Sequence, residues 1–226
     1  MNYEIQGNPY PVAVIKLENG ESVVCQRGAM TWMTPNMVMQ TTGGGSIGRM
    51  FSRAISGESM FQNIYTAQGG EGLIAFGSSV PGEIMPIEIT PNQTIIAQKS
   101  AFLASSQSIN YELFFQKKIS TGFFGGEGFI MQRFFGSGML FLEIDGSVIS
   151  YTLEPNQSLL IDTGYLAAMD STCSIEVEAV KGVGNALLGG EGFFNTKVTG
   201  PGRVWLQTMP IAQMASSIGR YIPSKG

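Results

Sequence analysis

The carboxylates that could do chemistry stand in glycine-rich turns at three points of the chain. Residues 125–130 read Gly-Gly-Glu-Gly-Phe-Ile, residues 189–194 read Gly-Gly-Glu-Gly-Phe-Phe, and residues 56–61 read Ser-Gly-Glu-Ser-Met-Phe. If the three turns converged on one axis, Glu58, Glu127 and Glu191 would offer carboxylate oxygens to a hard cation such as Ca²⁺. The simpler interpretation, which we favour, is that each carboxylate accepts backbone N–H bonds within its own turn, where glycine allows close approach.

Other catalytic chemistry is disfavoured by composition. The chain of 226 residues has no histidine, which removes Ser-His-Asp and Cys-His nucleophiles and His-ligated zinc. The glycine turns lack the Lys-Ser/Thr of a phosphate-binding loop. Only three aspartates occur, and no pair of carboxylates stands out as a glycosidase site. We therefore predict a protein that is not an enzyme and that needs no cofactor.

Charge and the two cysteines limit location and partners. The formal net charge is −4, the 13 basic residues are scattered, and a nucleic-acid surface would need clustered Lys and Arg. Cys25 and Cys173 stand in no metal-binding spacing, so we predict buried free thiols in a reducing compartment. The N-terminus has no signal-peptide or transit-peptide pattern, and no segment is apolar enough to span a bilayer. We expect a soluble, cytoplasmic protein.

The chain resembles itself three times. Residues 91–96 (Pro-Asn-Gln-Thr-Ile-Ile) recur at 155–160 (Pro-Asn-Gln-Ser-Leu-Leu), and 18–24 is a weaker copy, which aligns Glu21, Gln93 and Gln157. The glycine turns repeat at a similar spacing, and a third pattern begins at Gly72, Gly138 and Gly202. These offsets predict three units, residues 1–82, 83–146 and 147–209, followed by a C-terminal helix and tail at 210–226. Units of this size would have to share a core.

Within each unit the hydrophobic period is two, which is typical of strands. In residues 111–115 and 173–179, every second residue is apolar and is expected to face the core, and the residues between are expected to face outward. Asn19-Gly20 and Asp145-Gly146 are typical of hairpin turns. We therefore predict an all-β fold of three tandem β-sandwich units with pseudo-threefold symmetry. After Pro210, the apolar residues Ile211, Met214, Ala215 and Ile218 have helical spacing, ended by Gly219 and Pro223. We expect this short helix to dock on the β body, with a partner-binding face as the alternative.

Apolar residues also precede the three glycine turns. They either close the ends of the units or form one hydrophobic face for a membrane or a protein partner. The residues of this candidate interaction patch are Met50, Phe51, Phe123, Phe124, Leu187 and Leu188.

Three patterns together resemble a known family. They are Gly28-Ala29-Met30, the repeated Gly-Gly-Glu-Gly-Phe, and the run Pro-Gly-Arg-Val-Trp-Leu-Gln-Thr-Met-Pro at 201–210. The chain, from about Tyr3 to Tyr221, resembles the altered inheritance of mitochondria family, member twenty-four of that series, a mitochondrial biogenesis family with bacterial members. The resemblance implies a triplicated double-stranded β-helix, similar to the trp RNA-binding attenuation protein fold, and attaches no enzymatic activity. Without a transit peptide, the chain looks like a bacterial, cytoplasmic member.

The expected function is that of a non-catalytic structural or interaction module, a scaffold for an unknown protein partner or for the membrane periphery. The alternative is a ring-like protein that binds a ligand or RNA, although the acidic composition makes nucleic acid a poor partner. The sequence is also compatible with a homo-oligomer.

Overall fold

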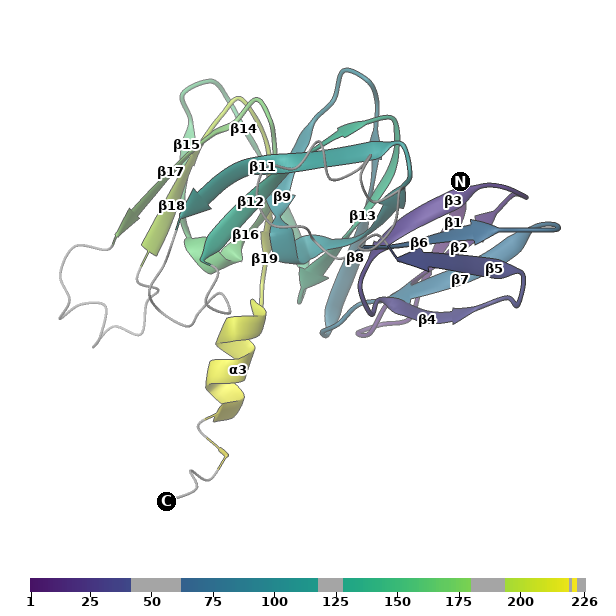
Figure 1. The fold of residues 1–226 in the computed structure, drawn as a ribbon. Helices are drawn as coiled ribbons and strands as arrows, with labels where there is room; N and C mark the ends of the chain where they lie inside the picture. Colours follow the sequence, from purple (N-terminus) through teal and green to yellow (C-terminus); the bar gives the residue numbers. More distant parts are fainter. Residues whose placement is uncertain (42–61, 118–127, 180–193, 220, 223–226) are drawn as a thin grey trace.

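The protein is built almost entirely of antiparallel strands (Figure 1). The computed structural model describes residues 1–41, 62–117, 128–179, 194–219 and 221–222. The strands of the N-terminal part are β1 (Asn2–Gln6), β2 (Val12–Leu17), β3 (Ser22–Gln26), β4 (Met30–Met33), β5 (Met37–Thr41), β6 (Gln62–Ala67) and β7 (Gly72–Gly77). The strands of the middle part are β8 (Gly82–Ile89), β9 (Ile95–Gln98), β10 (Phe102–Ser106), β11 (Ile109–Lys117), β12 (Phe129–Gly136) and β13 (Gly138–Asp145). The C-terminal part holds β14 (Val148–Leu153), β15 (Ser158–Asp162), β16 (Leu166–Asp170), β17 (Ser174–Ala179), β18 (Phe194–Thr199), β19 (Gly202–Gln207) and the helix α3 (Ile211–Gly219). The predicted mostly β fold with a short C-terminal helix is confirmed.

The strands form four sheets, which we name A to D. Sheet A has the order β1-β2-β7-β4, sheet B β5-β6-β3-β10-β13-β8, sheet C β11-β12-β9-β16-β19-β14, and sheet D β15-β18-β17. The order of sheet C is the order of sheet B with six added to each strand number. Sheet B therefore joins strands of the N-terminal part to strands of the middle part, and sheet C joins the middle part to the C-terminal part.

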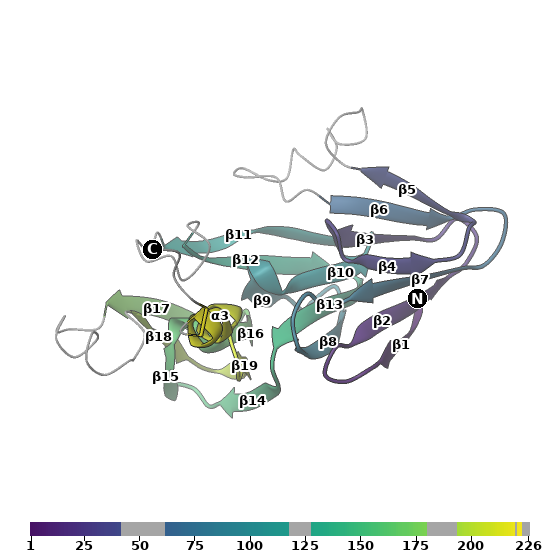
Figure 2. The same ribbon diagram turned by 90° about the horizontal axis from the view of Figure 1, so that it is seen from below.

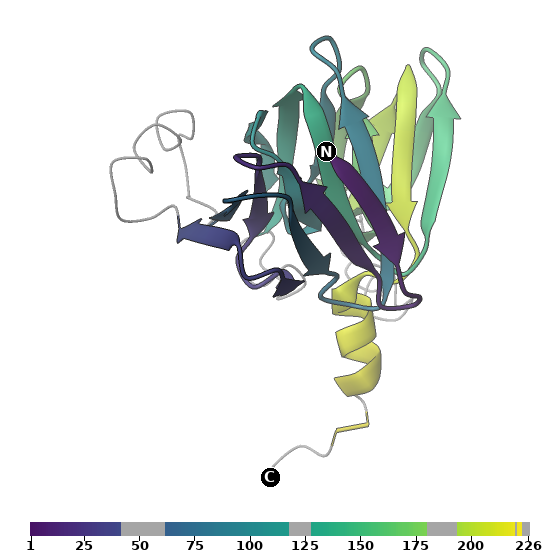
Figure 3. The same ribbon diagram turned by 90° about the vertical axis from the view of Figure 1, so that its right-hand side faces the viewer.

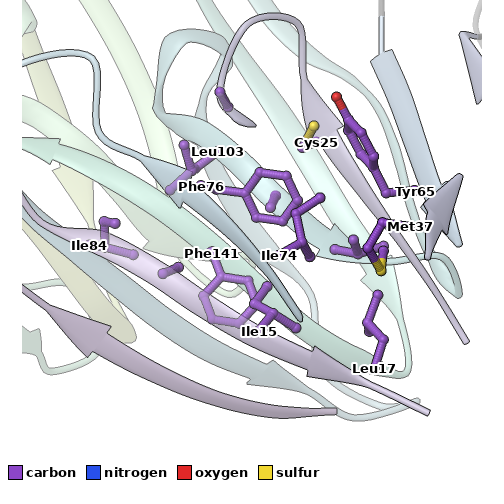
Figure 4. Packing of buried hydrophobic residues seen from close by; sticks show 14 of the residues in the cluster. Ile15, Leu17, Cys25, Met37, Tyr65, Ile74, Phe76, Ile84, Leu103 and Phe141 are labelled. Carbon is purple, nitrogen blue, oxygen red and sulfur yellow. The ribbon is translucent and has the colours of Figure 1, made fainter. Parts of the chain in front are cut away.

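Three hydrophobic clusters lie between successive sheets. The first joins sheets A and B and includes Phe76 of β7 and Phe141 of β13, both fully buried (Figure 4). The second joins sheets B and C, where the rings of Phe102 and Phe134 stack with their centroids 5.8 Å apart. The third joins sheets C and D. Sheets B and C thus contribute to two clusters each, so the parts of the chain share their cores instead of folding around separate ones.

Two turns predicted to be hairpins carry the chain between sheets instead. Asn19-Gly20 connects β2 of sheet A to β3 of sheet B, and Asp145-Gly146 connects β13 of sheet B to β14 of sheet C. In each turn only the glycine has a positive φ, 84° at Gly20 and 77° at Gly146. The hairpin prediction was wrong because the two-residue hairpin turn needs positive φ at both central residues, or at the first, to match the strand twist.

The predicted alternation holds in β17 and is interrupted in β11. In β17, Ile175 and Val177 face the core and Ser174, Glu176 and Glu178 are exposed. In β11, the register with β12 shifts between Leu113 and Phe115, so Phe114 is an extra residue. Such a bulge changes which face the following side chains take, and Phe114 and Phe115, although neighbours in the chain, both pack against the third cluster. Leu113, just before the shift, is exposed.

Both cysteines are free and buried, as predicted. Burial raises the pKa of the Cys25 thiol to about 12, although a backbone hydrogen bond from Asn63 acts in the opposite direction. Burial, and then the negative charge of Asp170, raise the pKa of Cys173. Both side chains therefore behave as small core residues.

The helix forms where the sequence predicts it, but it does not dock on the β body. None of its residues is buried, and Figures 1 and 3 show α3 extending away from the sheets. The docking prediction was wrong because the turn between β19 and α3, where Met209 N–H donates to the C=O of Asp145, directs the helix outward.

Candidate functional site

The residues singled out from the sequence as sites lie outside the described residues. This holds for the candidate cation ligands Glu58, Glu127 and Glu191 and for the whole candidate interaction patch (Met50, Phe51, Phe123, Phe124, Leu187 and Leu188). The three stretches that contain them, 42–61, 118–127 and 180–193, connect strands that are antiparallel neighbours, β5 to β6, β11 to β12 and β17 to β18. The convergence of the glutamates and the exposure of the patch stay predictions.

Among the described residues, the C-terminal helix offers one candidate interaction surface. The carboxylate of Asp145, at the end of β13, accepts a hydrogen bond of 2.7 Å from the backbone N–H of Ile211. The backbone C=O of the same residue accepts from Met209 N–H at 3.1 Å. The first helical turn is closed by Gln213 and Met214, whose N–H groups donate to the C=O of Pro210. Asp145 therefore fixes the point at which the helix leaves the β body.

The apolar face of α3 is open to solvent. Ile211 and Ile218, one near each end of the helix, are about half exposed, and Tyr221 and Ile222 beyond it are exposed further. No charged residue lies within the helix, and its polar residues are Gln213, Ser216 and Ser217. A helix with four apolar positions at i, i+3, i+4 and i+7 presents the pattern that fits an apolar groove.

Two further candidate surfaces are the edge of sheet A at β4 and the edge of sheet D at β15. Each of these strands has one strand partner among the described residues, β7 for β4 and β18 for β15. Three large apolar side chains are exposed there, Trp32 and Met33 on β4 and Leu160 on β15. Sequence reasoning missed these residues because alternation identifies a strand but does not say which strand lies beside it.

Two carboxylates among the described residues, Glu143 and Asp170, each accept several hydrogen bonds from the protein. Glu143 of β13 is buried, and its oxygens accept hydrogen bonds from the side-chain amide of Gln26, both hydroxyls of Ser78 and Ser79, and the backbone N–H of Ser79. Asp170 forms a paired hydrogen bond with the Arg203 guanidinium, at 3.0 and 3.1 Å. Within the described ranges no three Cys, Asp or Glu side chains gather as metal ligands would.

Comparison with known proteins places the chain in a family. Its residues 3–209 match the model of the family described as Mitochondrial biogenesis AIM24. An uncharacterized protein of Streptococcus pyogenes serotype M6 is 31% identical over 224 residues, which cover 95% of this chain and 88% of that protein. A crystal structure of another protein from Streptococcus pyogenes, 28% identical, superposes with a TM-score of 0.79 over 98% of this chain and 99% of that one. No helix in the described part of the chain is both long and apolar enough to cross a bilayer. Because the family model matches residues 3–209, which is most of the chain and includes strands of all four sheets, the chain belongs to the Mitochondrial biogenesis AIM24 family.

Proposed function

We propose that this protein is a non-catalytic scaffold that binds a partner protein by inserting α3 into an apolar groove of the partner. The observation that carries the proposal is the helix itself, which is fixed at its start by Asp145 and has the apolar residues Ile211 and Ile218 about half exposed. Exposed apolar side chains arranged on one face of a projecting helix are the pattern of helix-in-groove recognition.

A protein groove suits this helix better than a membrane surface does. Helices that lie in the membrane interface are rich in Lys and Arg on the polar face and gain from attraction to anionic lipids. Residues 211–219 contain no charged residue, and the chain as a whole has a net charge of −4. The interaction would therefore depend on apolar contact within a shaped groove.

The β body would act as the rigid support. We propose that it consists of three copies of one six-strand unit, β2–β7, β8–β13 and β14–β19. The support is the matching order of sheets B and C and the same one-residue register shift in three strand pairs, β4 with β7, β10 with β13 and β16 with β19. The pseudo-threefold relation, the likeness to the trp RNA-binding attenuation protein fold and the alternative of a ligand- or RNA-binding ring stay predictions.

Photocrosslinking tests the proposal. A photoreactive amino acid at Ile218 should crosslink to a partner protein in cells that produce the chain natively. The same residue at Ser216, which faces the other side of the helix, is the matched control and should not crosslink. Ile218→Asp should abolish co-purification of the crosslinked protein. Equal crosslinking from both positions, or none from either, would contradict the proposal. If the protein instead floats with anionic liposomes, and Ile218→Asp abolishes this flotation, then α3 binds a membrane and not a protein partner.

A further inference from the structure

Two of the sheet edges in the described part of the chain, at β4 and β15, belong to strands whose counterparts form a junction twice within the chain. Among the described strands, β4 is one end of sheet A and β15 is one end of sheet D, and the two strands lie at opposite ends of the molecule in Figures 1 and 2. We propose that β15 of one copy of this chain pairs with β4 of a second copy, so that sheet D of the first and sheet A of the second form one continuous sheet. This inference uses a surface other than α3 and does not depend on the proposed function.

The two junctions within the chain share one register. In sheet B, β3 pairs with β10 through Cys25↔Ala104, Val24↔Ser105 and Val23↔Ser106. In sheet C, β9 pairs with β16 through Ala97↔Ala168, Ile96↔Met169 and Ile95↔Asp170. Each residue of the second set stands 72 or 64 residues after its equivalent in the first, which are the offsets of the sequence repeat.

Extending the same offsets predicts the register of the third junction. Adding 64 to Ile96 gives Leu160 of β15. On the other side, Trp32, Ala104 and Ala168 hold the same place after the register shift in β4, β10 and β16, so Met33 is equivalent to Met169. The third junction would therefore pair Leu160 with Met33 and Ile161 with Trp32.

Burial at these positions follows the presence of the neighbouring strand. Ile96 and Met169 are both 0% exposed and pack in the same cluster between sheets C and D. Their equivalents at the open edges, Leu160 and Met33, are 67% and 37% exposed. Residues that are core in two junctions are thus open to solvent at the two edges where the third would form, and a second copy would bury them.

The occupant is a second copy because the surface repeats a contact that this chain already makes with itself. The new sheet would have the order β17-β18-β15-β4-β7-β2-β1, which continues the pattern of sheets B and C. Two unlike edges meet, so the contact is heterologous and leaves one open edge at each end of a dimer. Trp32 stands where both internal junctions have alanine, and large aromatic side chains are enriched in interfaces between chains. The assembly would grow into a closed ring or a filament.

Sedimentation velocity of the purified full chain tests the proposal. The wild type should form species of at least twice the 24.3 kDa of one chain. A charge at the junction, in Met33→Lys or Leu160→Glu, should return the protein to a single chain, whereas the double variant should recover the assembly because the two charges lie opposite each other. Met39→Lys, at an exposed position on the edge strand β5, is the matched control and should leave the assembly intact. Ile218→Asp should also leave it intact, which separates this inference from the role of α3.

Engineered cysteines test the register. After mixing and oxidation, a Met33→Cys chain and a Leu160→Cys chain should form a disulfide-linked dimer that contains one of each. Met39→Cys mixed with Leu160→Cys should not. A wild type that sediments as one chain at all concentrations would overturn the proposal, as would a double Met33→Cys, Leu160→Cys chain that crosslinks only within itself. An assembly that both charge variants leave unchanged would also overturn it.

Discussion

The Asp145 carboxylate and the Ile211 backbone N–H are joined by a 2.7 Å hydrogen bond that links the end of β13 to the start of α3. The two residues are 66 positions apart in the sequence. This contact matters because the helix has no buried side chain to hold it. The first N–H groups of a helix have no acceptor within the helix, so a carboxylate there satisfies one of them and interacts favourably with the helix dipole.

Removing this acceptor should loosen the helix without unfolding the body. We expect Asp145→Ala to lower the local stability of α3 by about 1 kcal/mol, the usual cost of losing a helix cap. Hydrogen exchange at the amides of Met214 and Ala215 should accelerate, and exchange in the sheets should not change. Asp145→Asn retains an acceptor oxygen and is the control. Equal exchange rates in the wild type and in Asp145→Ala would show that the hydrogen bond does not hold the helix.

The same carboxyl should give the unfolding free energy a defined dependence on pH. Burial raises the pKa of Asp145 above its ordinary value of 3.8, the Ile211 N–H lowers it, and the nearby Glu143 charge raises it, with burial the largest effect. Because the folded chain holds this proton more tightly than the unfolded chain, the contribution of Asp145 to stability falls as pH rises through the interval between 3.8 and the raised value. The unfolding free energy of Asp145→Asn minus that of the wild type should therefore increase from acid to neutral pH in urea titrations. A difference that decreases would contradict the direction of the shift.

Two glycines with positive φ should differ sharply in what alanine costs. At Gly136 (φ 126°), an added Cβ would lie 2.3 Å from the backbone oxygen of Ser108, whereas at Gly20 (φ 84°) nothing lies within 4 Å. We expect Gly20→Ala to cost about 1 kcal/mol of unfolding free energy for its backbone conformation alone. Gly136→Ala should cost about 3 kcal/mol or more, because a backbone atom must also move. Urea denaturation of the two variants checks the difference, and equal costs would show that the loop at Ser108 adjusts freely.

The buried Glu143 should be hard to replace. Glu143→Ala would leave the Gln26 amide, the Ser79 N–H and the Ser79 hydroxyl without their acceptor, whereas the Ser78 hydroxyl still has the Val80 C=O, and we expect a loss of about 3 kcal/mol of unfolding free energy. Glu143→Gln keeps one acceptor oxygen and should lose less. Thermal or urea unfolding measures both. A Glu143→Gln variant more stable than the wild type would show that burying the charge costs more than its hydrogen bonds contribute.

The Cys25 thiol should be unreactive in the folded protein. Its pKa of about 12 leaves almost no thiolate at neutral pH, and the side chain is fully buried. In a Cys173→Ser background, a thiol-specific chromogenic reagent should label Cys25 only after denaturant is added. Complete labelling under native conditions would show that β3 separates readily from its neighbours.

Much of the local structure could be predicted from the sequence. The alternation in 174–178, the helix at 211–219 and the burial of both cysteines are present as predicted, because each depends on the period of a short segment or on one side chain's preference for the core. The family could also be recognised from residues that lie close together in the chain. Local errors arose where strand pairing mattered, as in β11, where the register with β12 shifts after Leu113 and the predicted alternation is interrupted.

The tertiary structure alone decided which surfaces are open. The repeated segments 91–96 and 155–160 have similar sequences, yet Ile96 is buried and Leu160 is exposed. The difference comes from the neighbour, since β9 lies between β12 and β16 whereas β15 has β18 as its one neighbour among the described strands. A period of two specifies which side chains share a face, but pairing between distant strands depends on where the chain brings them. For the same reason the sequence predicted the helix and only the position of Asp145 beside Ile211 determined that it projects from the body.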